Sequence, residues 1–71
     1  MQKYANLGGN SSVVSYEIEP TRIWVQFKSG RPYSYSYRKA GVSHVETMKE
    51  LARRGVGLCS YIQHNVRYLY D

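Results

Sequence analysis

Hydrophobic and polar residues alternate in two neighbouring segments near the start of the chain. In residues 14–18 and 23–27, every second side chain is apolar or aromatic, and most of the side chains between them are polar. A period of two is typical of a β-strand with one buried face. The four-residue connection, 19–22, predicts an antiparallel hairpin with one apolar face. The expected cross-strand pairs on that face are Ile18 with Ile23, Tyr16 with Val25, and Val14 with Phe27.

A third alternating run, 33–37, follows a turn that contains Gly30. A two-residue turn would align its tyrosines with Gln26 and Trp24, whereas a three-residue loop would align them with the aliphatic face. We predict the longer loop, because Gly30 can adopt the left-handed conformation that it requires and both tyrosine rings are then buried. The expected pairs are Tyr33 with Val25 and Tyr35 with Ile23.

The hydrophobic period becomes helical in the second half of the chain. Ser43 and Glu46 have the spacing of a capping box and predict the start of a helix, which ends at Arg53-Arg54-Gly55. A second helix is predicted to begin at Gly57. The apolar stripe of the first helix consists of Val45, Met48, Leu51 and Ala52, and that of the second consists of Leu58, Tyr61, Ile62, Asn65, Val66 and Leu69.

These elements predict an α+β domain, a three-stranded antiparallel β-meander with two short C-terminal helices packed on one face. Residues 1–10 contain two asparagines and two glycines among scattered apolar side chains. We therefore expect them to form a flexible N-terminal lead-in. Residues 11–71 are expected to form a single domain.

Composition and charge narrow the class of protein. The chain has 71 residues, with ten Lys and Arg against five Asp and Glu, which gives a formal net charge of +5. A polyanion is therefore a natural partner. One cysteine cannot form an internal disulfide, and no Cys/His cluster has metal-ligand spacing, so we predict a reducing, cytoplasmic location and no cofactor. The sequence has neither a membrane-length apolar stretch nor a signal-peptide core, and so disfavours membrane insertion and export.

A series of short motifs runs through most of the chain. They are Ser11-Ser12-Val13, Tyr16, Ile23-x-Val25-x-Phe27, Gly30, Tyr33-x-Tyr35, Met48-x-x-Leu51-Ala52, and Gly55-Val56-Gly57-Leu58-Cys59-Ser60-Tyr61-Ile62. In these positions the chain resembles the KTSC domain family. That family occurs as a module at the C-terminus of some lysyl-tRNA synthetases and as small stand-alone bacterial and phage proteins. The resemblance implies the stand-alone kind, with an α+β fold and a role in nucleic-acid binding.

The joint between the two predicted helices is the first candidate site. Its glycines let backbone amides converge where the second helix begins, and two guanidinium groups precede them, an arrangement that suits a phosphate. The alternative is an ordinary helix stop whose arginines are solvated. The residues predicted to bind nucleic acid are Arg53, Arg54, Gly55, Gly57, Arg67 and Lys49.

The sheet face opposite the core is the second candidate. Trp24 and Lys28 are expected on this face, together with Gln26, Ser34 and Ser36. A tryptophan on a basic sheet can stack a nucleobase, as in sheet-based RNA-binding proteins. Because tryptophan is also enriched in protein interfaces, the alternative for this face is a protein contact.

We predict a small non-enzymatic basic module that binds RNA or DNA backbone with low sequence specificity. Catalysis is disfavoured, because Cys59 and His64 lie about 140° apart around one helix and cannot form a nucleophile and base pair. The alternative function is a protein-interaction module, such as a phage or mobile-element protein that binds and modulates a host protein complex. Neither a membrane partner nor a small-molecule substrate is expected.

Overall fold

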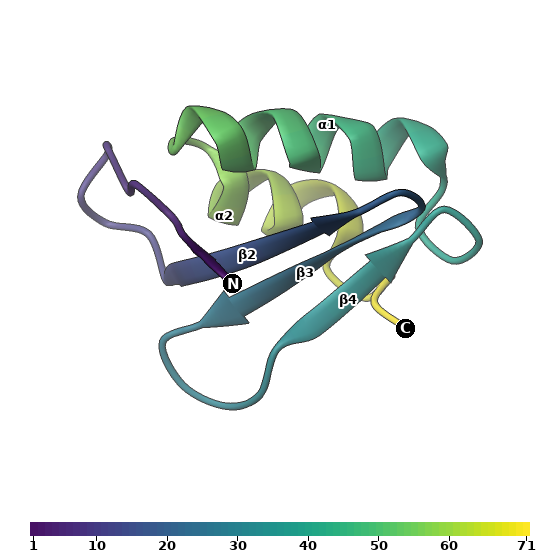
Figure 1. Ribbon diagram of the computed structural model, residues 1–71, viewed down its shortest axis with the longest axis horizontal. Helices are drawn as coiled ribbons and strands as arrows, with labels where there is room; N and C mark the ends of the chain where they lie inside the picture. Colours follow the sequence, from purple (N-terminus) through teal and green to yellow (C-terminus); the bar gives the residue numbers. More distant parts are fainter.

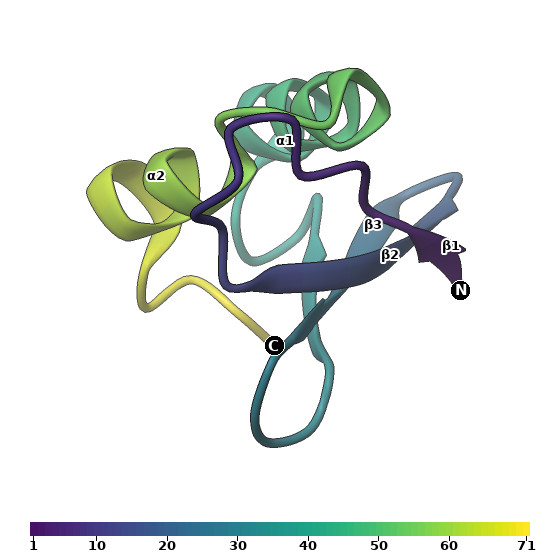
Figure 2. The same ribbon diagram turned by 90° about the vertical axis from the view of Figure 1, so that its left-hand side faces the viewer.

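The computed structural model describes all 71 residues. One antiparallel sheet carries the helices on one of its faces, and Figures 1 and 2 show that no helix covers the other face. The strands, in sheet order, are β1 (Gln2–Lys3), β2 (Val13–Glu19), β3 (Arg22–Phe27) and β4 (Tyr33–Ser36). The helices are α1 (Val42–Arg54) and α2 (Leu58–Tyr61), which continues as the π-helical segment η1 (Ile62–Val66). The α+β class is confirmed, whereas the predicted number of three strands is corrected to four.

The first hairpin has the predicted register over most of its length. Ile18 pairs with Ile23 and Tyr16 pairs with Val25, as expected. The third expected pair is wrong, because a β-bulge between Val13 and Ser15 places Val13 opposite Phe27. The inserted residue reverses the alternation, so that Val13 is 2% exposed and Val14 is 43% exposed.

The second hairpin confirms the longer loop. Tyr33 pairs with Val25 and Tyr35 pairs with Ile23, and Gly30 has the left-handed φ of +87°. Tyr35 is 1% exposed, but the expected burial of Tyr33 is wrong, since 38% of its surface is exposed. Tyr33 begins β4 at the end of the sheet, where its ring contacts the rings of Phe27 and Tyr70.

The predicted capping box does not form. Helix α1 begins two residues earlier, with Gly41 instead of Ser43 as its N-cap, at φ +98° and with no side-chain cap. The carboxylate of Glu46 instead accepts a hydrogen bond from the Tyr37 hydroxyl and pairs with the Lys49 ammonium. The predicted stop is confirmed: Gly55 has a left-handed φ of +78°, and its amide donates to the Leu51 carbonyl oxygen.

The second helical segment begins after Gly57, as predicted, with Gly57 in the left-handed region at φ +86°. Leu58, Ile62 and Val66 point into the core. Asn65, which was expected in the apolar stripe, is exposed, and its side chain donates to a backbone carbonyl of the preceding turn. The turn widens to a π-helix at Ile62, which changes the angular position of the residues that follow.

Residues 1–10, which we expected to precede the folded domain, contribute to it. Strand β1 pairs with β2, and Tyr4 is 2% exposed and belongs to the core. The Leu7 amide donates to the Gly55 carbonyl oxygen over 2.7 Å. The N-terminal segment therefore crosses from the sheet to the joint between α1 and α2, as Figure 2 shows. Its two-residue strand is too short to give a periodic signal in the sequence.

Candidate nucleic-acid interface

Arg53 and Arg54 lie together at the C-terminal end of α1, and both are exposed. The Arg54 Nε lies 3.4 Å from the Glu50 carboxylate one turn earlier. Two of the predicted phosphate-binding residues are thus accessible cations beside the helix joint.

The N-terminal segment packs closely against Gly55, the first glycine of the joint. A Cβ atom on Gly55 would lie 2.6 Å from the Cβ of Ala5. The Leu58 amide, the first of α2, donates to the Tyr4 hydroxyl over 3.3 Å. Gly55 therefore serves a tight turn and a close backbone approach, so its side of the joint is closed, whereas Val56 and Gly57 line a cavity of about 330 Å³ beside α2.

Lys49 and Arg67 do not join this group. Lys49 is 4% exposed, and its ammonium lies 3.1 Å from the Pro20 carbonyl oxygen and 3.0 Å from the Glu46 carboxylate. Arg67 follows η1, at the opposite end of the second helical segment from Gly57. The structure therefore separates the predicted set: Lys49 ties α1 to the β2–β3 turn, and Arg67 lies at the far end of the second helical segment.

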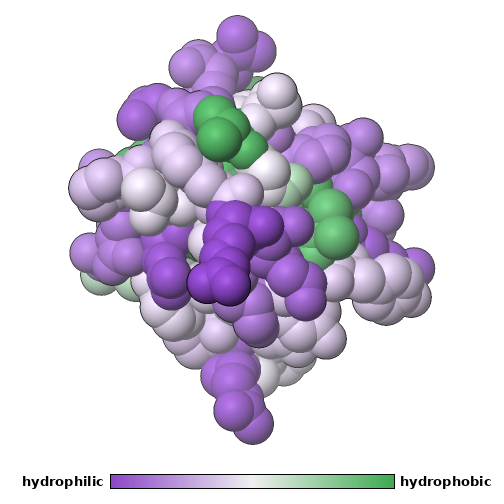
Figure 3. Space-filling model, turned by 90° about the vertical axis from the view of Figure 1, so that its right-hand side faces the viewer, coloured by the Kyte–Doolittle hydropathy of each residue, from purple (hydrophilic) through white to green (hydrophobic).

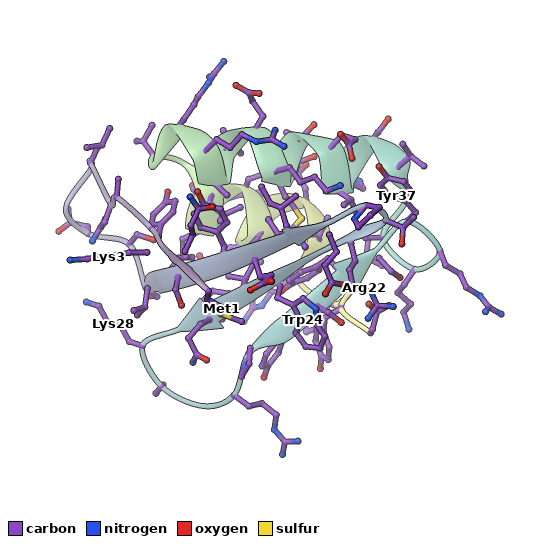
Figure 4. The ribbon with its side chains drawn as sticks, in the orientation of Figure 1. Met1, Lys3, Arg22, Trp24, Lys28 and Tyr37 are labelled. Carbon is purple, nitrogen blue, oxygen red and sulfur yellow. The ribbon has the colours of Figure 1, made fainter.

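The uncovered side of the sheet, here called the open sheet face, presents Trp24 among cations. Figure 4 shows Lys3 and Lys28 at one end of this face, with Trp24 and Arg22 farther along β3. The guanidinium of Arg22 lies 6.0 Å from the centroid of the Trp24 ring and also pairs with Glu19. Neither Lys3 nor Lys28 is in an ion pair, so their charges are free to act on a ligand.

The loop between β3 and β4 adds a further cation to the same end of the molecule. The Gln26 side-chain amide donates to the carbonyl oxygens of Phe27 and Gly30 over 2.8 and 3.1 Å. These bonds hold the loop that carries Lys28 and Arg31, and Arg31 is exposed without an acidic partner. The sequence analysis predicted Trp24 and Lys28 on this face. It did not predict Lys3 there, because residues 1–10 were expected to lie outside the fold. It also did not assign Arg31 to this face, because Arg31 belongs to the loop and not to a strand.

The β4 side of the open sheet face is covered, contrary to expectation. Ser34 and Ser36 are each only 7% exposed. Their hydroxyls donate to the two carboxylate oxygens of Asp71, over 2.9 and 2.7 Å, and the Asp71 amide donates to the Ser34 carbonyl oxygen. The C-terminal residues thus bind along the edge strand β4, a contact between distant segments that no local pattern announces.

Two of the cavities in the structure bear on the candidate site. One, of about 450 Å³, is bordered by Trp24 and by the C-terminal residues over β4. The other, of about 330 Å³, lies between the N-terminal segment and α2 and is lined mainly by neutral polar side chains. Cys59 borders the second cavity, where its sulfur accepts a hydrogen bond from the Gln63 side chain.

The chain matches no protein-family model, and no curated protein or solved structure is significantly similar to it. The resemblance to the KTSC domain family stays a prediction. None of the helices has the length and apolar character that a membrane crossing requires.

Proposed function

We propose that this protein is a non-enzymatic basic module that binds RNA or DNA backbone with low sequence specificity, and that the open sheet face is its contact surface. The observation that carries the proposal is an accessible Trp24 on an uncovered sheet, flanked by the unpaired cations Lys3, Lys28 and Arg31. Cations neutralise phosphates and release counterions, and an aromatic ring stacks a base without reading its identity. This combination suits a single strand, whose bases are free to stack.

The open sheet face is a better candidate than the helix joint for two physical reasons. The joint offers Arg53 and Arg54 but no aromatic platform beside them, and the backbone amides of Gly55 and Leu58 already have protein partners. The open sheet face provides both components of single-strand binding. At the joint, Arg54 pairs with Glu50, so Arg53 makes the larger contribution to the positive field that attracts a polyanion, and neither arginine is proposed as a main direct contact.

The proposal is tested by fluorescence anisotropy with a labelled oligouridylate at several salt concentrations. Two double variants each remove two positive charges: Lys28→Ala with Arg31→Ala on the open sheet face, and Arg53→Ala with Arg54→Ala at the joint. We expect the first variant to reduce the magnitude of the slope of log K against log salt by about 1.4, because each phosphate contact to a single strand contributes about 0.7, and the second variant to change the slope less. Absence of salt-sensitive binding to RNA or DNA by the unmodified protein would overturn the proposal.

The proposed setting is the cytoplasm of a bacterium or of a phage-infected cell, in line with the single, reduced cysteine.

The alternative function, a protein-interaction module, can be tested by isolating the protein with its partners from host cells. A host partner that stays bound after nuclease treatment and at high salt would favour it, because an apolar interface resists screening. On the side of the molecule that Figure 3 shows, hydrophilic residues dominate and the hydrophobic areas are small and separate.

A further inference from the structure

The cavity beside Trp24 combines aromatic rings, a fixed carboxylate and a guanidinium. It measures about 450 Å³ and lies where the open sheet face meets the edge strand β4. Trp24 borders it from β3, Tyr33 from the start of β4 and Tyr70 from the C-terminal segment. This volume is larger than that of a single planar heterocycle. Such a ring can therefore enter the cavity and still lie close enough to stack on one of its aromatic side chains.

The aromatic rings of this cavity are held in place but remain accessible. The rings of Tyr33 and Tyr70 are in edge contact, with centroids 4.7 Å apart, and Phe27 supports Tyr33 from the other side at 6.0 Å. Tyr33 and Tyr70 are nevertheless 38% and 40% exposed. Such supported, half-exposed rings lose little conformational freedom when a planar ligand stacks on them.

Three hydrogen bonds fix Asp71 at the cavity wall, and two of them are accepted by its carboxylate. One oxygen accepts from the Ser34 hydroxyl and the other from the Ser36 hydroxyl, and the backbone amide of Asp71 bonds to β4. An ionised carboxylate has about four lone-pair positions, so each oxygen keeps one for a ligand. The group therefore presents two adjacent acceptors and no donor.

We propose that this cavity binds a guanine base of a single-stranded nucleic acid, stacked on Trp24 and hydrogen-bonded to Asp71, an inference that rests on the proposed function. Guanine carries two neighbouring N–H donors on its Watson–Crick edge, which match two carboxylate oxygens. Adenine, cytosine and uracil each place a ring or carbonyl acceptor beside their donor, and this acceptor faces the carboxylate unfavourably. The binding module thus gains one base-selective position within an otherwise sequence-tolerant surface.

The charges around the cavity favour a nucleotide over a cationic ligand. Arg31 borders the cavity without an acidic partner, whereas Arg22, which lies over the Trp24 ring, is paired with Glu19. The Arg31 guanidinium would repel an ammonium group, although aromatic rings beside a carboxylate otherwise suit one. It attracts a phosphate next to a bound base.

Trp24 is the only tryptophan of the chain, so its fluorescence reports directly on this cavity. Titration with guanosine, adenosine and uridine monophosphates should quench it, with affinity for the guanine nucleotide higher by about tenfold. Asp71→Asn should reduce the affinity for the guanine nucleotide to that for adenosine monophosphate. Glu17→Gln is the matched control. Glu17 pairs with Trp24 across the β2–β3 ladder, on the side away from β4, and its substitution removes one negative charge, as Asp71→Asn does.

The unmodified protein alone can overturn the inference: equal quenching by the three nucleotides, or none, excludes a guanine site. So does a guanine preference that survives in Asp71→Asn when the unfolding midpoint of that variant is unchanged. Anisotropy with an oligouridylate that contains one central guanosine, compared with the plain oligouridylate, separates this inference from the proposed function. Salt-sensitive binding of both with equal affinity refutes only the guanine cavity, whereas binding of neither refutes the proposed function and this inference together.

Discussion

Gly55 is the point at which the N-terminal segment and the helix joint come closest. Its φ of +78° lies in the left-handed region, and an added Cβ would lie 2.6 Å from the Cβ and 3.5 Å from the Cα of Ala5. We therefore expect Gly55→Ala to destabilise the protein through two separate effects. The alanine must adopt a strained backbone conformation, and the N-terminal segment must move away from the joint.

The magnitude follows from these two effects. A left-handed conformation costs alanine about 1 to 2 kcal/mol relative to glycine. Overpacking of a closed contact adds about 1 to 3 kcal/mol. The total, about 2 to 5 kcal/mol, is a large part of the roughly 4 to 10 kcal/mol expected for a chain of 71 residues.

The measurement is urea unfolding followed by Trp24 fluorescence. Gly30→Ala is the matched control, because Gly30 has a similar φ of +87° but no atom within 4 Å of an added Cβ, so that only the backbone effect applies. The double variant Ala5→Gly with Gly55→Ala should recover most of the steric part, because it removes the methyl group that the new Cβ meets. An unfolding free energy for Gly55→Ala equal to that for Gly30→Ala would show that the N-terminal segment does not pack on the joint.

Three further predictions concern individual hydrogen bonds and titrating groups. Lys49→Met should cost about 1 to 3 kcal/mol in urea unfolding, because it removes two hydrogen bonds of a buried ammonium, whereas the exposed Lys39→Met should stay within about 0.5 kcal/mol. Tyr4→Phe should cost about 1 to 2 kcal/mol, since it leaves the Leu58 amide without its acceptor, and an unchanged urea midpoint would contradict this hydrogen bond. Burial raises the pKa of the Tyr35 hydroxyl from 10.0 to about 12. The stability gained by burying the neutral hydroxyl is therefore fully present below pH 10 and is lost between pH 10 and 12. Urea unfolding midpoints measured across that range should fall, and a constant midpoint would contradict this pKa.

The sequence predicts best those parts of the fold in which one face of an element is buried. Ile23 and Val25 alternate with polar neighbours, and a register error of one residue would expose them, so the hairpin register follows from the pattern. The bulge does not follow, because Val13 and Val14 are the same residue type and either could occupy the buried position. The capping box failed for a different reason: Glu46 has tertiary partners, which a local motif cannot include.

The candidate site likewise has parts that the sequence predicts and parts that it does not. Strand alternation correctly placed Trp24 on the uncovered face of the sheet. The charge pattern of α1 did not distinguish the solvated Arg53 from the buried Lys49, since both are cations at helical positions near polar neighbours. Asp71 could not be placed at all, because its contacts with Ser34 and Ser36 join residues that are far apart in the chain and depend on how the C-terminal segment leaves η1.

The cations of this protein fall into two groups with different physical roles, and the groups can be separated by experiment. Arg22, Lys49 and Arg54 each pair with a glutamate, so their charges are largely neutralised within the fold. Lys28 and Arg31 have no such partner and are exposed, so the field that reaches a polyanion comes from cations of their kind. Removing Lys28 and Arg31 together should weaken oligonucleotide binding but change the unfolding free energy by no more than about 0.5 kcal/mol per residue. Lys49→Met should lower the unfolding free energy but leave oligonucleotide binding nearly unchanged. If it weakened binding as much as the Lys28→Ala, Arg31→Ala variant does, the buried ammonium would also act on the ligand.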